Sequence, residues 1–238
     1  MQSNGLTAWE LFCRRGDRLL FGALDLWVPR GEALHLVGPN GIGKTSLIRI
    51  LAGLLPPSPT GLPKGFAHTG WVEWQGSVGY LDGKPTLDEH LPLSEALGFW
   101  TKLDRAAEVP LERLGLAGLA DIPVRFLSTG QRKRAGLARL IGQGADHWLL
   151  DEPLNGLDSD GAALVEALIA EKRAAGGVVV VASHQPLALP GAQVLDLRDF
   201  PPSPSGKGRG WGLDANVEFP PADVEPPPQP LPTREGLL

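Results

Sequence analysis

The spacing of hydrophobic residues changes several times along the chain, and each change predicts a different element. Residues 6–28 mix apolar and polar positions in short runs, as strands of an edge sheet do, and the apolar run 33–37 indicates a buried strand. Helical spacing follows over residues 44–55, and two prolines end it. One face of this helix carries Leu47, Ile48, Leu51 and Leu54.

The alternation of periods continues to about residue 200. We predict a loop over 56–70, mostly helical structure over about 91–142, a helix over 159–175, and short strands at 71–74, 77–81, 148–150, 178–182 and 194–197. Strands that alternate with helices in this way favour an α/β fold with a mainly parallel core sheet. We expect an antiparallel β edge region before residue 33 and an α-helical lobe inserted between two core strands.

The character of the chain changes at about residue 200. Residues 1–200 carry the apolar runs of one domain, whereas residues 201–238 contain ten of the 23 prolines and few aliphatic residues. Such a segment buries too little apolar surface to offset the entropy lost when it becomes ordered. We therefore predict a disordered tail without a catalytic role.

Composition narrows the classes of function. The 238 residues are 42% hydrophobic, enough for one full core, and a net charge of −5 gives no overall attraction to nucleic acid or anionic lipid. Cys13 is the single cysteine, so no internal disulfide can form, which fits a reducing cytoplasm. The sequence shows no signal-peptide pattern and no apolar run near the roughly 18 residues of a membrane helix. We expect no nucleic acid partner, and membrane contact only through another protein.

The glycine-rich loop between the strand 33–37 and the helix 44–55 carries the strongest chemical motif. It reads G-P-N-G-I-G-K-T and matches the phosphate-binding pattern G-x4-G-K-[ST] in full. Its glycines let backbone N–H groups face the phosphates of ATP, and the helix N-terminus adds positive potential. Lys44 would neutralise the β- and γ-phosphates, and the Thr45 hydroxyl would hold Mg²⁺. The candidate nucleotide-binding residues here are Gly38, Pro39, Asn40, Gly41, Ile42, Gly43, Lys44, Thr45 and Ser46.

Two acids follow the apolar strand at 148–150, an arrangement that fits a Walker B element. Asp151 would position Mg²⁺, directly or through water. Glu152 would polarise the attacking water as a general base. A solvated turn can also carry two acids after a strand, and the phosphate loop upstream favours the catalytic interpretation.

The segment L-S-T-G-Q at residues 127–131 identifies the class of ATPase. Ser128 and Gln131 have the spacing of a capping box, which predicts a helix over about 131–141. Its place between the phosphate loop and Asp151 makes the segment resemble the L-S-G-G-Q signature of ABC ATPases. The resemblance implies that Ser128, Gly130 and Gln131 of one subunit contact the γ-phosphate held by the other subunit.

Two shorter segments extend the resemblance to ABC ATPases. Residues 155–158, N-G-L-D, resemble the D-loop, whose family consensus is S-A-L-D. Ser183 and His184, directly after the strand 178–182, resemble the loop of the switch histidine. The resemblance implies that the His184 imidazole touches the γ-phosphate and Glu152, and that Lys44, Glu152 and His184 together form the catalytic set.

Longer segments narrow the resemblance to one branch of these ATPases. The stretches LFCRRGDRLLF, GPNGIGKTSLIRILAGLLPP, LSTGQRKRAGLARL, WLLDEPLNGLD and ASHQPL resemble the ATP-binding subunit of the cytochrome c maturation system, long called the haem exporter ATPase. This implies a P-loop ABC ATPase fold, with a nucleotide-binding domain over residues 1–200. It also implies a homodimer of ATPase subunits, an integral membrane permease as partner, and a place on the cytoplasmic face of the inner membrane. The implied task is haem export or the release of a haem chaperone.

The sequence departs from the ABC pattern in two places. Residues 80–84, Y-L-D-G-K, lack the glutamine that usually follows this strand and contacts Mg²⁺ and water. Arg15 falls where an aromatic residue normally stacks on adenine, and a guanidinium plane can also stack on a base.

The sequence leaves two alternative functions open and argues against two others. The ATPase could serve a different small ABC exporter, or a soluble Fe–S assembly system. A P-loop kinase would lack the 127–131 signature, and a GTPase would carry an N-K-x-D base-reading motif, which this sequence does not contain.

Overall fold

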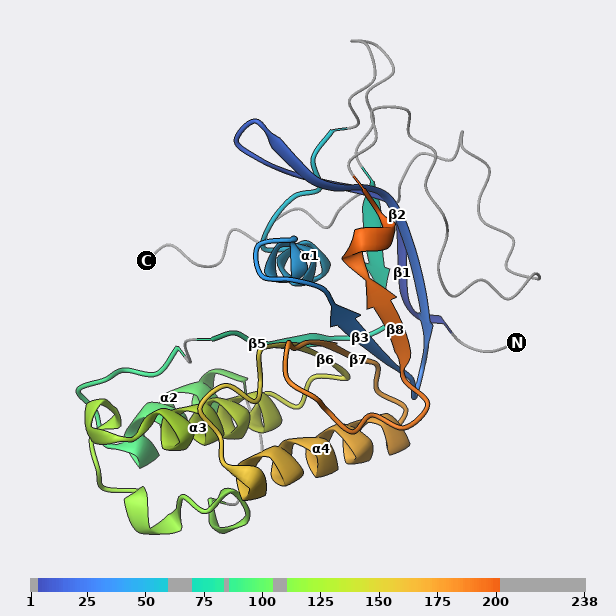
Figure 1. The fold of residues 1–238 in the computed structure, drawn as a ribbon. Coiled ribbons are helices and arrows are strands. Elements are labelled where there is room, and N and C mark those ends of the chain that lie inside the picture. The colour runs from blue at the N-terminus through green and yellow to red at the C-terminus, as the bar shows by residue number, and fades with distance from the viewer. Residues whose placement is uncertain (1–3, 60–69, 84–85, 105–110, 202–238) are drawn as a thin grey trace.

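Two sheets and four α-helices, stacked in layers, form the part of the chain that the computed structural model describes, residues 4–59, 70–83, 86–104 and 111–201 (Figure 1). The strands and helices alternate as the hydrophobic pattern predicts. The predicted tail and most of the predicted loop at 56–70 lie outside the described residues.

The smaller sheet is antiparallel, with the strand order β2-β1-β4. Its strands are β1 (Asn4–Arg15), β2 (Arg18–Pro29) and β4 (Trp71–Trp74). The β1–β2 register shifts between Ala8 and Leu11, next to Glu10, whose φ of 46° lies in the left-handed region. The Glu10 N–H donates to Asp25 Oδ1 at 2.7 Å across this irregularity. The strands β1 and β2 form the predicted antiparallel edge region, and β4, which was predicted only as a short strand, extends the same sheet.

The larger sheet is parallel and has the strand order β5-β6-β7-β3-β8. Its strands are β3 (Ala33–Val37), β5 (Val78–Leu81), β6 (His147–Asp151), β7 (Val179–Ala182) and β8 (Gln193–Asp196). Along β7, Val179 and Val181 belong to one apolar cluster, and Val180 and Ala182 to another. The sheet therefore buries both faces, as parallel sheets do.

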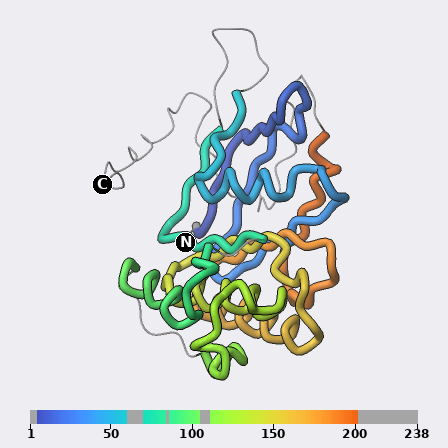
Figure 2. The backbone as a smooth tube through the Cα atoms, turned by 90° about the vertical axis from the view of Figure 1, so that its left-hand side faces the viewer, coloured from blue at the N-terminus to red at the C-terminus, as the bar shows by residue number. Residues whose placement is uncertain are grey.

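Helices cover the two faces unequally. Helix α1 (Lys44–Leu51) packs with the antiparallel sheet on one face, and α2 (Leu93–Asp104), α3 (Thr129–Gly142) and α4 (Ser159–Ala174) lie on the other. Figures 1 and 2 show this division, with the blue strands and α1 above the sheet and the green to orange helices below. Between α2 and α3, residues 111–128 form three 3₁₀ turns: Glu112–Leu114, Ala117–Leu119 and Val124–Phe126. The stretch from α2 to α3 is the predicted helical lobe.

Helix α1 ends four residues earlier than predicted. Gly53, with φ of 71°, closes it in a Schellman turn, because the Leu54 N–H donates to Arg49 O at 2.9 Å and the Gly53 N–H to Ile50 O at 3.0 Å. The turn carries Leu54 off the apolar face, and it is 65% exposed while Leu47, Ile48 and Leu51 are buried. The prediction that Leu54 shares a helix face with these three residues was therefore wrong.

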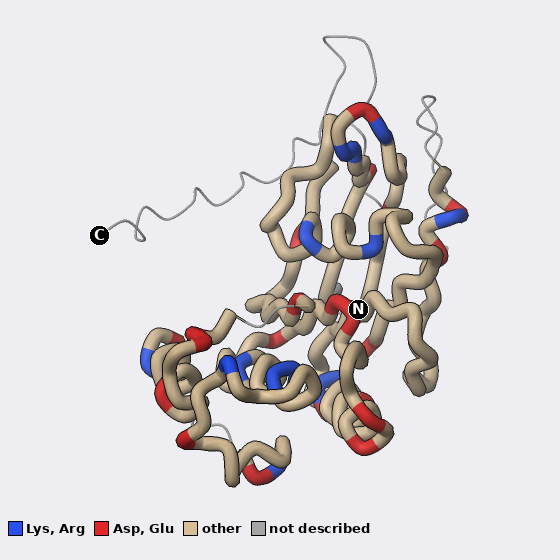
Figure 3. Tube along the Cα trace, turned by 60° about the vertical axis from the view of Figure 1, so that its left-hand side comes forward, with Lys and Arg blue, Asp and Glu red and all other residues tan. Residues whose placement is uncertain are grey.

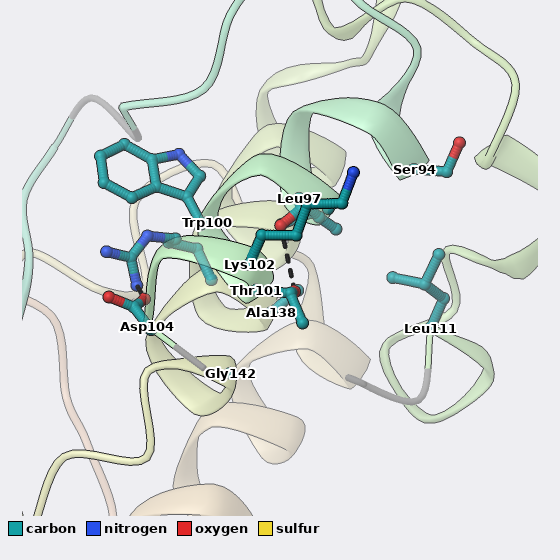
Figure 4. A pocket seen from close by; sticks show the side chains of 11 residues that line it. Ser94, Leu97, Trp100, Thr101, Lys102, Asp104, Leu111, Ala138 and Gly142 are labelled. Atoms are coloured by element: carbon teal, nitrogen blue, oxygen red, sulfur yellow. Dashed lines mark hydrogen bonds and ion pairs between the residues drawn. The ribbon is translucent and has the colours of Figure 1, made fainter. Parts of the chain in front are cut away.

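A charged pair fastens α2 to α3 beside a cavity of about 390 Å³ (Figure 4). Arg139 Nη1 lies 2.8 Å from Asp104 Oδ2, and the Arg139 guanidinium sits 4.1 Å from the centre of the Trp100 ring. Trp100 Nε1 in turn donates to Thr86 O at 2.9 Å. The two contacts of Arg139 join α2 to α3, and the Trp100 hydrogen bond ties α2 to the segment that precedes it.

The parallel register brings several loops to one edge of the larger sheet. Asp151 lies opposite Ala182, and Leu36 opposite Ala182 on the other side, so β6, β7 and β3 end side by side. Ligands of open parallel sheets bind at this carboxyl edge. The segments that carry the phosphate-loop motif, the two acids and His184 all leave the sheet here.

Candidate nucleotide-binding site

The loop between β3 and α1 has the backbone that phosphate binding requires. Gly38, Gly41 and Gly43 have φ of 127°, 78° and 125°, values that side chains with a Cβ rarely adopt. A Cβ at Gly43 would also lie 3.1 Å from the Phe21 ring. The loop therefore depends on its glycines, and it delivers the chain directly into the first turn of α1.

Lys44 and Thr45 are the first two residues of α1, and their side chains contact different groups: Lys44 contacts the phosphate loop and Thr45 contacts Asp151. The Lys44 ammonium donates to Gly38 O at 2.7 Å and to Pro39 O at 3.3 Å, so it lies inside the curve of the loop. Thr45 Oγ1 donates to Asp151 Oδ1 at 3.2 Å, which brings the hydroxyl and the carboxylate of two distant motifs together. Burial raises the pKa of Asp151, and the Thr45 hydrogen bond opposes that shift.

Glu152 and His184 form a hydrogen-bonded pair. His184 Nδ1 lies 2.7 Å from Glu152 Oε2, and the two residues follow the adjacent strands β6 and β7. Glu152 has φ of 50°, in the left-handed region, and its N–H donates to Ala182 O at 2.8 Å. The strained backbone turns the carboxylate toward the histidine instead of continuing the strand.

Most of these groups border one cavity of about 350 Å³, although Asp151, which contacts Thr45, is not part of its wall. Its walls include the phosphate loop, both members of the carboxylate–imidazole pair and Asn155. Arg15 lies at the same end of α1, with Nε 3.4 Å from Ser46 Oγ, although it is not a wall of the cavity. The structure thus collects Asn40, Gly41, Gly43, Lys44, Thr45, Ser46, Glu152 and His184 around one space.

The 127–131 segment borders a different cavity. Ser128 caps α3: its Oγ accepts the Gln131 N–H at 3.2 Å, and Gln131 Oε1 accepts the Ser128 N–H at 2.8 Å, the predicted capping box. Helix α3 begins at Thr129, two residues before the predicted start. Ser128 and Gly130 line a space of about 370 Å³ together with Gly156 and Asp158, and neither of them borders the phosphate-loop cavity.

The segment 155–158 lies between the two cavities. Asn155 faces the first and Gly156 the second, and Gly130 packs so tightly on Gly156 that a Cβ at Gly130 would lie 2.8 Å from Gly156 O. Asn155 Oδ1 also accepts a hydrogen bond from Gln185 Nε2 at 3.2 Å, next to His184. Sequence reasoning missed Gln185, whose only hint was its place directly after the histidine.

Lys133 is a second residue that sequence reasoning missed. It is 4% exposed, and its ammonium donates to Glu152 O at 3.0 Å. A lysine after a helix cap is usually a surface residue. The available hint was its helical spacing with Leu137 and Leu140, both of which are buried.

The segment that lacks the usual glutamine lies beside the two acids. Leu81 pairs with Leu150, so Asp82 leaves the sheet next to Asp151. Lys84 lies outside the described residues. The position after β5 therefore carries a carboxylate near the site, where an amide is the usual group.

Charges of both signs are interspersed over the molecule (Figure 3). None of the described helices combines the length and the apolar character needed to cross a membrane.

Comparison with known proteins defines the class. The ABC transporter family model matches residues 21–155, and this chain belongs to that family. The fold agrees: an ATP-binding subunit of an ABC transporter superposes with a TM-score of 0.65 at 20% identity, covering 76% of this chain and 79% of that one. The ADP conformation of an ATP-binding cassette superposes with a TM-score of 0.60 at 20% identity, covering 77% and 82%.

Closer relatives define the branch. The cytochrome c biogenesis ATP-binding export protein of Novosphingobium aromaticivorans is 54% identical over 85% of this chain and 100% of its own length. Its namesakes from Sphingopyxis alaskensis and Zymomonas mobilis are 47% and 42% identical, over 75% and 87% of this chain and 89% and 90% of their own. The chain is a member of the family of cytochrome c biogenesis ATP-binding export proteins, and it is an ATPase of the ABC type.

Proposed function

We propose that this chain hydrolyses ATP as one of two identical subunits of an export complex for cytochrome c biogenesis. Each subunit would hold ATP in the phosphate-loop cavity and close that cavity with the Ser128 helix of the other subunit. The observation that carries the proposal is the separation of the two half-sites: Ser128 and Lys44 border different cavities of one chain. An isologous pair of chains brings each half-site to its complement.

The residues of the phosphate-loop cavity fit ATP and Mg²⁺. Thr45 and Asp151 supply a hydroxyl and a carboxylate 3.2 Å apart, the hard oxygen donors that Mg²⁺ prefers alongside substrate phosphates. When bound, Mg²⁺ would offset charge on the β- and γ-phosphates. Lys44 and the backbone N–H groups of the loop would bind the same phosphates, and Arg15 would lie against the base.

Glu152 is placed to act on water. Its carboxylate would accept a proton from the water as the water oxygen bonds to the γ-phosphorus and the bond from that phosphorus to the departing ADP breaks. His184 would hold that carboxylate in position. Ser128, Gly130 and the α3 N-terminus of the partner would stabilise the charge on the transferring phosphoryl group. The Gln131 side chain completes the cap of this helix and so fixes the Ser128 backbone.

The first test concerns the chemistry. Glu152→Gln should keep ATP affinity, measured by calorimetry, because the amide has the same shape, while turnover should fall at least about a hundredfold, because the base is lost. Glu166→Gln is a matched control, since that carboxylate accepts the Ala188 N–H outside the cavity. Wild-type turnover in Glu152→Gln would refute its role as base.

The second test concerns the membrane partner and the cellular location of the ATPase. We propose that the ATPase binds an integral membrane permease at the cytoplasmic face of the inner membrane, and that ATP-driven closing and opening of the subunit pair drives haem export or the release of a haem chaperone. Purification from detergent-extracted membranes should then recover an integral membrane protein with this chain. Recovery of the active ATPase free of any membrane protein would argue for a soluble assembly system instead.

A further inference from the structure

Lys133 is a buried cation that the mechanism above leaves unused. It lies on α3, five residues after the cap Ser128, and only 4% of its surface is exposed. An ammonium group loses its hydration when it is buried, so a buried lysine needs close partners. The partner here is Glu152 O, at 3.0 Å from Lys133 Nζ.

The carbonyl that Lys133 contacts belongs to a residue with a strained backbone. Glu152 has φ of 50°, a conformation that residues with a Cβ adopt only where their surroundings hold them. Its N–H donates to Ala182 O at 2.8 Å, and its carbonyl also accepts a longer bond from the Asn155 N–H at 3.4 Å. Of the two hydrogen bonds that Glu152 O accepts, the one from Lys133 is the shorter.

We propose that Lys133 is a positioning residue for ATP hydrolysis: by holding Glu152 O it fixes the left-handed backbone that turns the Glu152 carboxylate toward His184. The proposal rests on the proposed function of Glu152 as base. Without the ammonium group, Glu152 would relax toward ordinary φ values and its carboxylate would leave the 2.7 Å contact with His184 Nδ1. A misplaced base loses rate while the phosphate-binding groups stay unchanged.

The surroundings of Lys133 support this role. Burial lowers the pKa of Lys133, and the nearby carboxylates of Asp151, Asp82 and Glu152 oppose that shift. Asp82 and Glu152 directly follow β5 and β6, and Asp151 is the last residue of β6, so the ammonium offsets repulsion among charges that the sheet brings to one edge. Because Lys133 lies on α3 and Ser128 caps the same helix, any movement of the half-site that faces the partner would also move the contact to Glu152.

The test is the variant Lys133→Met in the full chain with its copurified membrane partner. Methionine fills the space of the lysine stem without its charge or its donor. We expect kcat to fall at least about tenfold, while KM and the calorimetric Kd for ATP stay within about twofold of wild type. Adding Lys133→Met to Glu152→Gln should cause no further loss, because both changes act on the same step.

Lys172→Met is the matched control. Lys172 also donates from its ammonium to a backbone carbonyl, Ala145 O at 2.8 Å, and burial lowers its pKa as well, but it lies over the Trp148 ring and away from the nucleotide cavity. The Lys172→Met variant should have a lower unfolding temperature than wild type and an unchanged kcat. If Lys133→Met does not fold, Lys133→Gln, which loses the charge and the reach, must show the same fall in kcat with an unchanged Kd.

Three outcomes would overturn the inference: an unchanged kcat in Lys133→Met, an equal fall in Lys172→Met, or a further fall when Lys133→Met is added to Glu152→Gln. Each of them leaves the proposed function standing as long as Glu152→Gln alone lowers turnover at least about a hundredfold. If Glu152→Gln keeps wild-type turnover, the proposed function fails first, independently of Lys133.

Discussion

Lys44 is held inside the phosphate loop by two hydrogen bonds. Its ammonium donates to the carbonyl oxygens of Gly38 and Pro39, so its charge lies within the loop whose N–H groups would face the phosphates. Thr45 and Asp151 are likewise in contact across two motifs. These contacts place a positive charge and two side-chain oxygen atoms where the proposed binding of phosphate and Mg²⁺ requires them.

Lys44→Ala should therefore lose most of its ATP affinity, because the variant removes the positive charge at the β- and γ-phosphates. We expect Kd to rise at least about a hundredfold by calorimetry, equivalent to nearly 3 kcal/mol. Lys102→Ala, an exposed lysine on α2, is the control and should bind as wild type does. An unchanged Kd in Lys44→Ala would remove the phosphate-loop assignment.

The sequence predicted the contact that the family resemblance implies and missed the contacts that depend on side-chain packing. Glu152 and His184 could be placed together from the resemblance to ABC ATPases, and the structure shows that each follows a strand of one parallel sheet. The contact of Lys133 with Glu152 O could not, because it depends on how α3 lies against β6. The bond between Gln185 and Asn155 also joins two loops whose shapes no pattern specifies.

At the scale of elements, the β1–β2 hairpin carries an ionisable group in an unfavourable place. Burial raises the pKa of Asp25 to about 6, although the hydrogen bond from the Glu10 N–H opposes the shift. The unfolded chain has the ordinary value of 3.8. Between about pH 4 and 6 the folded chain therefore binds more protons than the unfolded chain, and its stability falls as pH rises through this window.

Asp25→Asn should remove this loss, because the amide stays neutral and its oxygen can still accept the Glu10 N–H. We expect the free energy of unfolding of Asp25→Asn, relative to that of wild type, to increase by about 1–3 kcal/mol when the pH is raised from 4 to 7.5. Urea unfolding at the two pH values measures this change. Asp17→Asn, in the exposed turn of the same hairpin, should show no such gain. Parallel stability curves for wild type and Asp25→Asn would contradict the prediction.

Element types followed from hydrophobic period, whereas element ends depended on single residues. Helix α3 and its cap were predictable from Ser128 and Gln131, whose two hydrogen bonds are local. Helix α1 ends at Leu51 because Gly53 adopts a left-handed conformation, and a glycine near a helix end can also stay helical. Pro56 and Pro57 predicted a helix end at residue 55, but the Schellman turn at Gly53 ends the helix before these prolines.

At the scale of the whole molecule, the two proposed half-sites lie at separate cavities. The phosphate-loop cavity and the Ser128 cavity are separate, and the 155–158 segment lies between them. Contacts run from His184 through Gln185 and Asn155 to Gly156, which packs on Gly130. In a pair of chains, this path would connect two places in one subunit: the site of its own γ-phosphate, and the N-terminus of α3, which would contact the γ-phosphate held by the other subunit.

Mixing two inactive variants tests this pairing most directly. Lys44→Ala removes the phosphate half-site, and Ser128→Asp places a negative charge at the other half while keeping a good helix cap. Each variant alone should be inactive. A mixed pair holds one intact site, so an equal mixture with its membrane partner should recover about a quarter of wild-type ATPase, since half of randomly formed pairs are mixed and each has one of two sites. A mixture no more active than its separate components, or full activity in Ser128→Asp alone, would contradict a site shared between two chains.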